Sequence, residues 1–124
     1  MGRFGVYACV GALSGALSVA IGAFAAHGIT DAHAKDLLAT GAHYHFMHTM
    51  AAIAALTFWR WGATRARFAP PFFFAGIAVF SGSLYALALG APGWTGAITP
   101  LGGLAFLAGW GVLAWAALQL RNPA

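Results

Sequence analysis

Residues 6–26 read VYACVGALSGALSVAIGAFAA, a run without a single acidic or basic side chain. About 20 predominantly apolar residues are needed for an α-helix to cross the hydrocarbon core of a bilayer. Three further stretches of this kind follow, at residues 42–59, 71–89 and 97–118. Because lipid offers no hydrogen-bond partners, each stretch must satisfy its own backbone groups, and a helix does so within one segment. The sequence therefore predicts an all-α, up-down-up-down bundle of four transmembrane helices, in a single integral membrane domain of residues 1–124.

The composition points to a lipid environment. Hydrophobic residues make up 61% of the chain and charged residues only 6%, whereas soluble domains carry about 25% charged residues. The formal net charge of +4 comes from few basic residues, and these lie at the ends of the apolar segments. That pattern is typical of membrane orientation and argues against a nucleic-acid partner. The lipid bilayer is the expected partner.

The first apolar segment could in principle be a cleaved signal peptide. Arg3 supplies a basic start, and Ala23-Phe24-Ala25 resembles a small-x-small cleavage site. The apolar run is, however, longer than the signal-peptide core of about 7–15 residues. We expect a retained transmembrane helix.

The loops give an orientation. Five of the six basic residues fall before the first span, between the second and third, or after the fourth: Arg3, Arg60, Arg65, Arg67 and Arg121. These three regions share one side of the membrane, and the positive-inside rule makes that side cytoplasmic. The sequence predicts an N-in/C-in protein of the cell inner (plasma) membrane.

Small residues recur at helical spacing, as expected where transmembrane helices pack closely. The positions that we expect at helix contacts are Gly11, Gly15, Ser18, Gly22, Gly82, Ala86 and Gly109. Some of these faces could contact other chains, so we expect a homo-oligomer or a hetero-complex with other membrane proteins. In the polar stretch 28–41, Thr30 or Asp31 could cap a short helix that turns Leu37 and Leu38 toward the bilayer.

Polar residues gather near the end of the predicted bundle opposite the arginines. The candidate ligand-binding set is His27, Tyr44, His48, Ser81 and Tyr85, with His45, Ser83 and Thr99 as further candidates. A polar group at this depth needs a hydrogen-bond partner. Two interpretations follow: the residues hydrogen-bond one another and fix the helices, or they line a ligand pocket in the outer leaflet.

Metal and catalytic chemistry find little support in the sequence. His27, His45 and His48 are weak candidates for a metal site, because imidazoles suit zinc or copper but the set lacks a cysteine or a well-placed carboxylate. No span contains the charged groups of a proton relay, and no phosphate-binding loop or catalytic triad is recognisable. We expect no metal, no cofactor and no enzymatic activity.

Four segments, in this order, also carry a family pattern: GALSVAIGAFAAHG at 15–28, TGAHYH at 40–45, SGSLYAL at 81–87 and GAITPLGG at 96–103. They resemble the uncharacterised domain-of-unknown-function 423 family of small polytopic membrane proteins. The resemblance implies membrane-spanning helices and no assigned activity. His43 and His45 depart from the pattern, since relatives tend to carry glutamine there. This departure weakens the three-histidine metal site and leaves His27 and His48 as the pair to test first.

Three functions compete at this point. The first is a structural or accessory subunit that packs within itself or within a larger membrane complex. The alternative is a ligand- or metal-binding membrane protein that uses the outer-leaflet His/Tyr/Ser pocket. An oligomeric transporter ranks last, because few polar residues could line a path through the cytoplasmic half.

Overall fold

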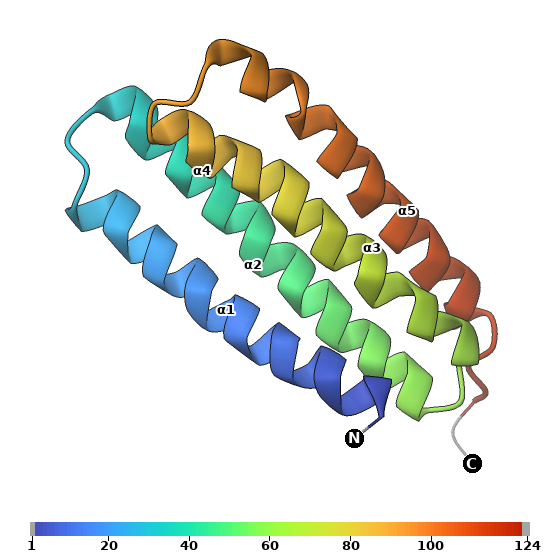
Figure 1. The fold of residues 1–124 in the computed structure, drawn as a ribbon. Helices are drawn as coiled ribbons and strands as arrows, with labels where there is room; N and C mark the ends of the chain where they lie inside the picture. Colours follow the sequence, from blue (N-terminus) through green and yellow to red (C-terminus); the bar gives the residue numbers. More distant parts are fainter. Residues whose placement is uncertain (1, 123–124) are drawn as a thin grey trace.

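Within residues 2–122, which the computed structural model describes, four helical rods run alternately in opposite directions (Figure 1). The first rod is α1 (Arg3–His27) and the second is α2 (Ala32–Arg60). This part of the chain contains no β-strand. The predicted all-α, up-and-down bundle is confirmed. Residues 1 and 123–124 of the predicted domain lie outside the described residues.

The third and fourth rods are each assembled from shorter helical segments. Those of the third rod are η1 (a 3₁₀ helix, Thr64–Phe68), α3 (Ala69–Gly76), η2 (a π-helix, Ile77–Ser81) and α4 (Gly82–Ala88). Those of the fourth rod are η3 (a 3₁₀ helix, Gly93–Ala97) and α5 (Thr99–Ala117). Pro70 lies in the first turn of α3, where its missing N–H leaves no helical hydrogen bond unmade.

The start of α2 differs from the prediction. The carboxylate of Asp31 accepts a hydrogen bond from the backbone N–H of Ala34 at 2.8 Å and caps the helix, as one of the two predicted capping residues. The expected separate short helix is wrong, however, because α2 continues without a break from Ala32 through the predicted span at 42–59. The histidines at 43, 45 and 48 therefore lie well inside a long helix rather than at its opening.

The π-helical segment lies where two helices meet with almost no space between them. A Cβ added to Gly102 of α5 would overlap the backbone N and Cα of Phe80 in η2. A Cβ added to Gly76 of α3 would overlap the ring of Phe106 in α5. Both glycines are buried. This contact holds α5 against the third rod at the level of η2.

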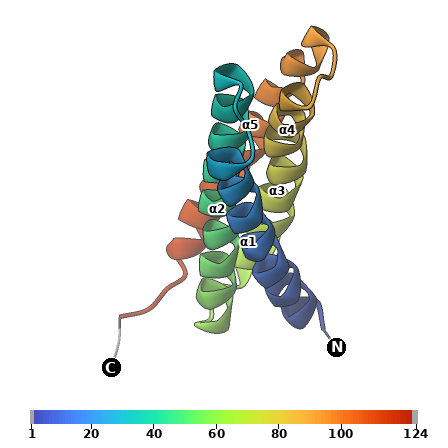
Figure 2. The same ribbon diagram turned by 90° about the vertical axis from the view of Figure 1, so that its left-hand side faces the viewer.

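Helix α1 packs on α2 through small residues in a constant antiparallel register. Cβ atoms added to Gly11, Gly15 and Gly22 would approach Ile53 at 3.2 Å, Thr49 at 3.7 Å and Ala42 at 3.9 Å. The buried positions of α1 are Gly11, Ser18 and Ala25, which recur every seven residues. Figure 2 shows α1 lying across α2, and much of its remaining surface is exposed.

The other expected packing positions lie in the second half of the chain. A Cβ added to Gly109 of α5 would come within 2.6 Å of the Phe73 ring, so this glycine lies at a close contact with α3. A Cβ added to Gly82 would meet no atom within 4 Å. Ala86 of α4 is half-buried.

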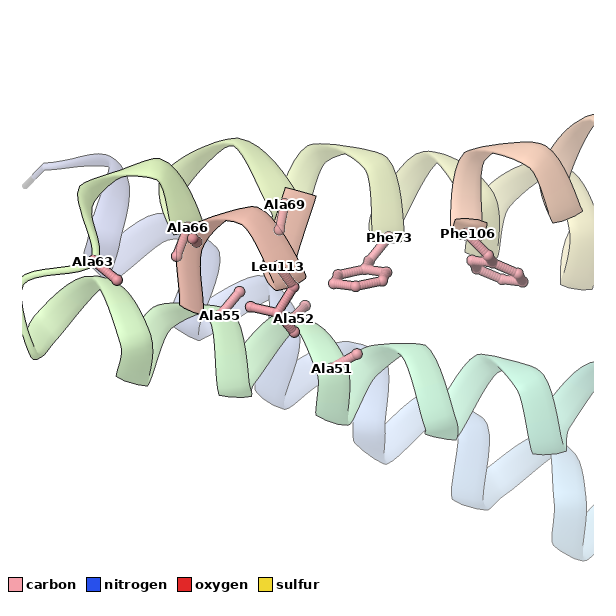
Figure 3. Packing of buried hydrophobic residues seen from close by; sticks show 10 residues of the cluster. Ala51, Ala52, Ala55, Ala63, Ala66, Ala69, Phe73, Phe106 and Leu113 are labelled. Carbon is pink, nitrogen blue, oxygen red and sulfur yellow. The ribbon is translucent and has the colours of Figure 1, made fainter. Parts of the chain in front are cut away.

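The hydrophobic core lies between α2, the start of the third rod and α5 (Figure 3). Alanines of α2 face alanines of η1 and α3, with three larger side chains beside them. The members are Ala51, Ala52, Ala55, Ala63, Ala66, Ala69, Phe73, Phe106, Leu113 and Ala116. Because most of the members are alanine, the rods approach closely, as the packing rule for membrane helices predicts.

Candidate functional site

His45 joins three helices through its imidazole. Its Nε2 lies 2.9 Å from the Oγ of Ser14 in α1, and its Nδ1 lies 2.9 Å from the hydroxyl of Tyr85 in α4. The Ser14 hydroxyl also lies 2.8 Å from Oγ1 of Thr49, one turn further along α2. His45 and Thr49 are 3% and 1% exposed. These four residues form a continuous hydrogen-bonded chain, which can be polarised in either direction because each hydroxyl can donate or accept.

His48, three residues after His45, contacts α5 instead. Its Nδ1–H donates to the carbonyl oxygen of Tyr44 at 2.8 Å, and its Nε2 accepts from the indole N–H of Trp110 at 3.1 Å. The imidazole also stacks on the ring of Phe106, with centroids 3.5 Å apart and planes 7° apart. Since one nitrogen donates and the other accepts, the geometry matches the neutral ring protonated on Nδ1.

Ser81 and Tyr85 connect the third rod to α2 at Gly41 and His45. The Ser81 hydroxyl donates to the backbone carbonyl of Gly41 at 2.7 Å and is fully buried. A Cβ added to Gly41 would come within 2.6 Å of the Tyr85 ring. Gly41 thus lets the tyrosine lie directly on α2 and reach His45. Ser83 has a different role, since its hydroxyl bonds to Thr99.

The structure brings together only part of the predicted set. His45, Ser81 and Tyr85 form one cluster, and His48 lies beside them on the same helix. His27 is exposed in the last turn of α1, away from this cluster. Tyr44 is 37% exposed and stacks near His48, with centroids 6.0 Å apart.

Sequence reasoning missed several partners. Ser14 and Thr49 complete the His45 chain, and Trp110 completes the bonding of His48. Thr49 could have been found, because it lies four residues after His45 and so shares its helix face. Trp110 lies 62 residues from His48, and no local pattern connects the two.

The predicted metal candidates do not converge. Among the described residues, no group of three or more His, Cys, Asp or Glu side chains lies close enough to hold a metal ion. His45 and His48 point to different helices. Every buried side-chain nitrogen and oxygen in residues 2–122 has a hydrogen-bond partner. The cluster is suited to fixing helices relative to one another.

A groove lies beside His48, between α2 and α5, and has a volume of about 470 Å³. Its lining is mostly aromatic and aliphatic and includes Tyr44, Phe80, Phe106, Leu107 and Trp110. Gly103 also borders it, and a Cβ added there would meet nothing within 4 Å. The groove is therefore an apolar recess on the side of the bundle.

Three rods are long and apolar enough to cross a membrane by length and composition, namely Arg3–His27, Thr64–Ala88 and Gly93–Ala117. The second rod, α2, is less apolar than these three, because it contains four histidines together with Lys35, Asp36 and Arg60. The buried polar side chains of α2, His45, His48 and Thr49, bond to residues of neighbouring helices, as expected for polar groups inside a membrane.

Known proteins match the chain over most of its length. The family model described as "Protein of unknown function (DUF423)" matches residues 21–103. A UPF0382 membrane protein of Haemophilus influenzae is 40% identical, covering 94% of this chain and 96% of its own. UPF0382 membrane protein YwdK of Bacillus subtilis is 38% identical over 92% of this chain and 97% of its own. UPF0382 inner membrane protein YgdD of Escherichia coli is 36% identical over 90% of this chain and 88% of its own.

No solved structure matches the chain significantly. The family match covers the second and third rods completely and the first and fourth in part, and the relatives are membrane proteins by name. The apolar rods and the interior placement of the polar residues agree with that description. The chain belongs to the DUF423 family of membrane proteins.

Proposed function

We propose that the protein is a non-enzymatic structural subunit of the membrane that associates with a second copy of itself through a face of α1 and α2. The polar cluster supports the first half of this proposal, since its buried groups are all engaged in hydrogen bonds. A general base or nucleophile must be able to reach a substrate, and His45 and His48 each use both ring nitrogens within the protein.

The observation that carries the association is the α1–α2 hollow, a shallow recess of about 360 Å³ on the lipid-facing side of these helices. Its lining residues are Ser18, Val19, Gly22, Ala39, Ala42, His43 and Phe46. Small residues form its floor, while Val19 and Phe46 are 63% and 49% exposed. Small side chains on a helix face let another transmembrane helix approach closely.

The exposed imidazole of His43 favours contact between this face and another helix. The middle of α1 is Gly15, which lies opposite Thr49. His43 is six residues from Thr49, or about 9 Å along the axis. With the middle of α1 at the bilayer midplane, His43 lies inside the hydrocarbon, whose half-thickness is about 15 Å. Its side chain is exposed there, although histidines within membranes normally face other helices.

A second copy fits this face by symmetry. In a twofold interface the same patch meets itself, so projecting side chains must lie next to hollows on one surface. The exposed Phe46 and Val19 beside Gly22 and Ala39 meet this requirement. The arrangement also brings the His43 of each copy into the interface, where a hydrogen bond across it satisfies the imidazole.

Native mass spectrometry after mild-detergent extraction tests the proposal. We expect a dimer for the wild type and for His43→Gln, which keeps a donor and an acceptor. We expect monomers for Ala39→Leu, which fills the hollow at an exposed position, and for His43→Leu. Ala114→Leu, at an exposed position of α5, is the matched control and should remain dimeric. A wild-type monomer, or a complex with a different protein only, would contradict the proposed dimer.

We also propose the orientation with both ends in the cytoplasm. Helix α1 begins, and α5 ends, at the end of the bundle that carries η1 (Figure 1). Five of six basic residues belong to this end, which supports the assignment through the positive-inside rule. Fusions of alkaline phosphatase and of green fluorescent protein to the C-terminus test it. Active phosphatase there would refute it.

A second candidate function is binding of an apolar ligand in the groove between α2 and α5. The supporting observation is the volume of about 470 Å³, which falls within the range of small-molecule pockets. Tyr44 offers a hydroxyl at its border. Lipid extracts from purified wild type should then contain a ligand that is absent from Gly103→Leu, a variant that fills the open space. Equal extracts from both proteins would exclude this function.

A further inference from the structure

The basic end of the bundle contains a further recess, whose lining includes none of the residues bonded to His45 or His48. It has a volume of about 380 Å³ and is lined by Arg3, Tyr7, Trp59, Arg67, Phe68 and Pro71. We name it the arginine pocket. Its residues come from the first turns of α1, the end of α2, η1 and the start of α3, so three rods meet around it.

Two guanidinium groups share this recess. Arg3 and Arg67 are both exposed, and the Arg67 guanidinium lies 4.6 Å from the centre of the Phe68 ring. The two carboxylate side chains of the sequence, Asp31 and Asp36, lie at the start of α2, at the opposite end of the bundle (Figure 1). Neither can neutralise the pocket. Two like charges that line one recess favour an anion between them.

The neighbouring Arg65 differs from Arg3 and Arg67, because its guanidinium group has a structural role. Arg65 donates from its guanidinium to the carbonyl oxygen of Trp115 at 3.3 Å and lies 4.4 Å from the centre of the Trp115 ring. Its backbone N–H also donates to the side-chain oxygen of Gln119 at 2.8 Å. Arg65 thus attaches η1 to the end of α5, whereas Arg3 and Arg67 border an open space.

The start of α1 adds to the positive potential. The residue before the helix is Gly2, which has no side chain to cap it, and the first turn contains no acidic residue. The N-terminal N–H groups of a helix carry a partial positive charge that favours anions. This helix end adds to the positive potential of the two guanidinium groups.

The remaining lining residues place the pocket at the level of lipid headgroups. Trp59 packs against Phe4 with ring centroids 5.5 Å apart, and Tyr7 lies 6.4 Å from Phe74 by the same measure. Trp and Tyr are enriched where the hydrocarbon meets the headgroups. Val10, one turn beyond Tyr7, is 41% exposed and continues this face of α1 toward the hydrocarbon.

From these observations we propose that the arginine pocket binds the phosphate of an anionic phospholipid, of the phosphatidylglycerol or cardiolipin class, with the acyl chains lying along α1. Guanidinium groups match phosphate oxygens with paired hydrogen bonds. Basic pockets between transmembrane helices on the cytoplasmic side suit such headgroups. Tyr7 and Trp59 cover the glycerol end of the headgroup, and Arg3 and Arg67 hold the phosphate from two rods.

Native mass spectrometry titrations of the purified protein with phosphatidylglycerol, and with phosphatidylcholine as the reference lipid, test this proposal. Arg3→Gln/Arg67→Gln should weaken phosphatidylglycerol binding by on the order of tenfold or more. The matched control is Arg60→Gln/Arg121→Gln, which removes two arginines from the same end outside the pocket. Both double variants lower the formal net charge from +4 to +2. Equal losses in the two would mean nonspecific attraction and would overturn the site.

Thermal unfolding separates loss of the site from loss of the fold. Both double variants should melt as the wild type does without anionic lipid. Only the wild type and the Arg60→Gln/Arg121→Gln control should gain stability when phosphatidylglycerol is added. If Arg3→Gln/Arg67→Gln does not fold, Arg3→Lys/Arg67→Lys replaces it, since lysine keeps the charge but lacks the planar fork. Its binding should be several-fold weaker than wild type, and unchanged affinity would overturn recognition by paired guanidinium groups.

Inorganic phosphate distinguishes a lipid site from a site for the free ion. Phosphate shares the anionic chemistry but has no glycerol or acyl chains to contact Tyr7 and the face of α1. We expect it to compete only at concentrations far above those of phosphatidylglycerol. Competition at equal concentrations would overturn the assignment to a lipid.

Discussion

From the contact between α5 and the π-helical segment, we predict opposite changes in stability when two adjacent residues are substituted. Gly102 and Gly103 are both in the first turns of α5. A Cβ at Gly102 would overlap the backbone of Phe80, whereas a Cβ at Gly103 would meet nothing within 4 Å. The atoms that Gly102 faces belong to the main chain and cannot move aside as a flexible side chain would. Gly102→Ala should destabilise the protein and Gly103→Ala should stabilise it.

The magnitudes follow from two opposing effects. Replacing glycine by alanine in a helix gains up to about 1 kcal/mol through the lower flexibility of the unfolded chain. Overpacking a close contact costs about 1–3 kcal/mol, and backbone against backbone belongs at the upper end of that range. Gly103→Ala is therefore expected to gain up to about 1 kcal/mol, whereas Gly102→Ala should lose about 1–2 kcal/mol after the two effects are combined.

Reversible unfolding in mixtures of dodecyl maltoside and sodium dodecyl sulfate, followed by circular dichroism, measures both variants on one scale. The separation of about 1–3 kcal/mol between them matters more than either value, because the substitutions are chemically identical and adjacent. Displacing η2 should also move Ser81, the residue after Phe80, away from the carbonyl of Gly41. Equal stability changes of the same sign in the two variants would refute the close contact between α5 and η2.

Three further predictions use the same unfolding assay. Ser14→Ala, which removes the side-chain bonds from α1 to α2, should cost about 1 kcal/mol, whereas Ser18→Ala should be nearly neutral because its hydroxyl donates within its own helix; equal costs would refute the distinction. Trp110→Phe leaves Nε2 of His48 without its donor and should cost about 0.5–1.5 kcal/mol, so an unchanged midpoint would show that the indole bond contributes nothing. Asp31→Ala removes the cap of α2 and should cost about 1 kcal/mol, with faster hydrogen exchange confined to the first turns of α2; unchanged exchange there would contradict it.

The number and direction of the helices could be predicted from the sequence because a bilayer imposes a length on each apolar segment. The exact start of α2 could not. Residues 32–41 contain His33, Lys35 and Asp36, which have the polarity of a loop. They form helix all the same, because Asp31 caps the first turn and the helix continues into the apolar stretch. Hydropathy detects where a helix enters the lipid, but it says little about how far the helix extends beyond the lipid.

The π-helical segment and the His48 partners were beyond sequence reasoning for a different reason. Residues 77–81 read IAVFS, a pattern that suits an ordinary α-helix equally well. What accompanies the π geometry is a contact with Gly102, and the partner of His48 is Trp110. Both depend on where α5 lies, which no local periodicity encodes. Serines and histidines were expected to bond one another, yet that expectation does not say which pairs form.

The small residues and the polar cluster have complementary effects on the register of α1. Gly11, Gly15 and Gly22 allow α1 to approach α2, but a slip of α1 by one helical turn would still place small residues against the same surface. Dispersion contacts of this kind discriminate weakly between such alternatives. Ser14 does discriminate, because its hydroxyl reaches both His45 and Thr49 only in the observed register. A slip would leave those buried groups without partners in a low-dielectric interior, which is costly. Close approach therefore comes from the glycines, whereas the choice of a single register comes from one serine and the histidine opposite it.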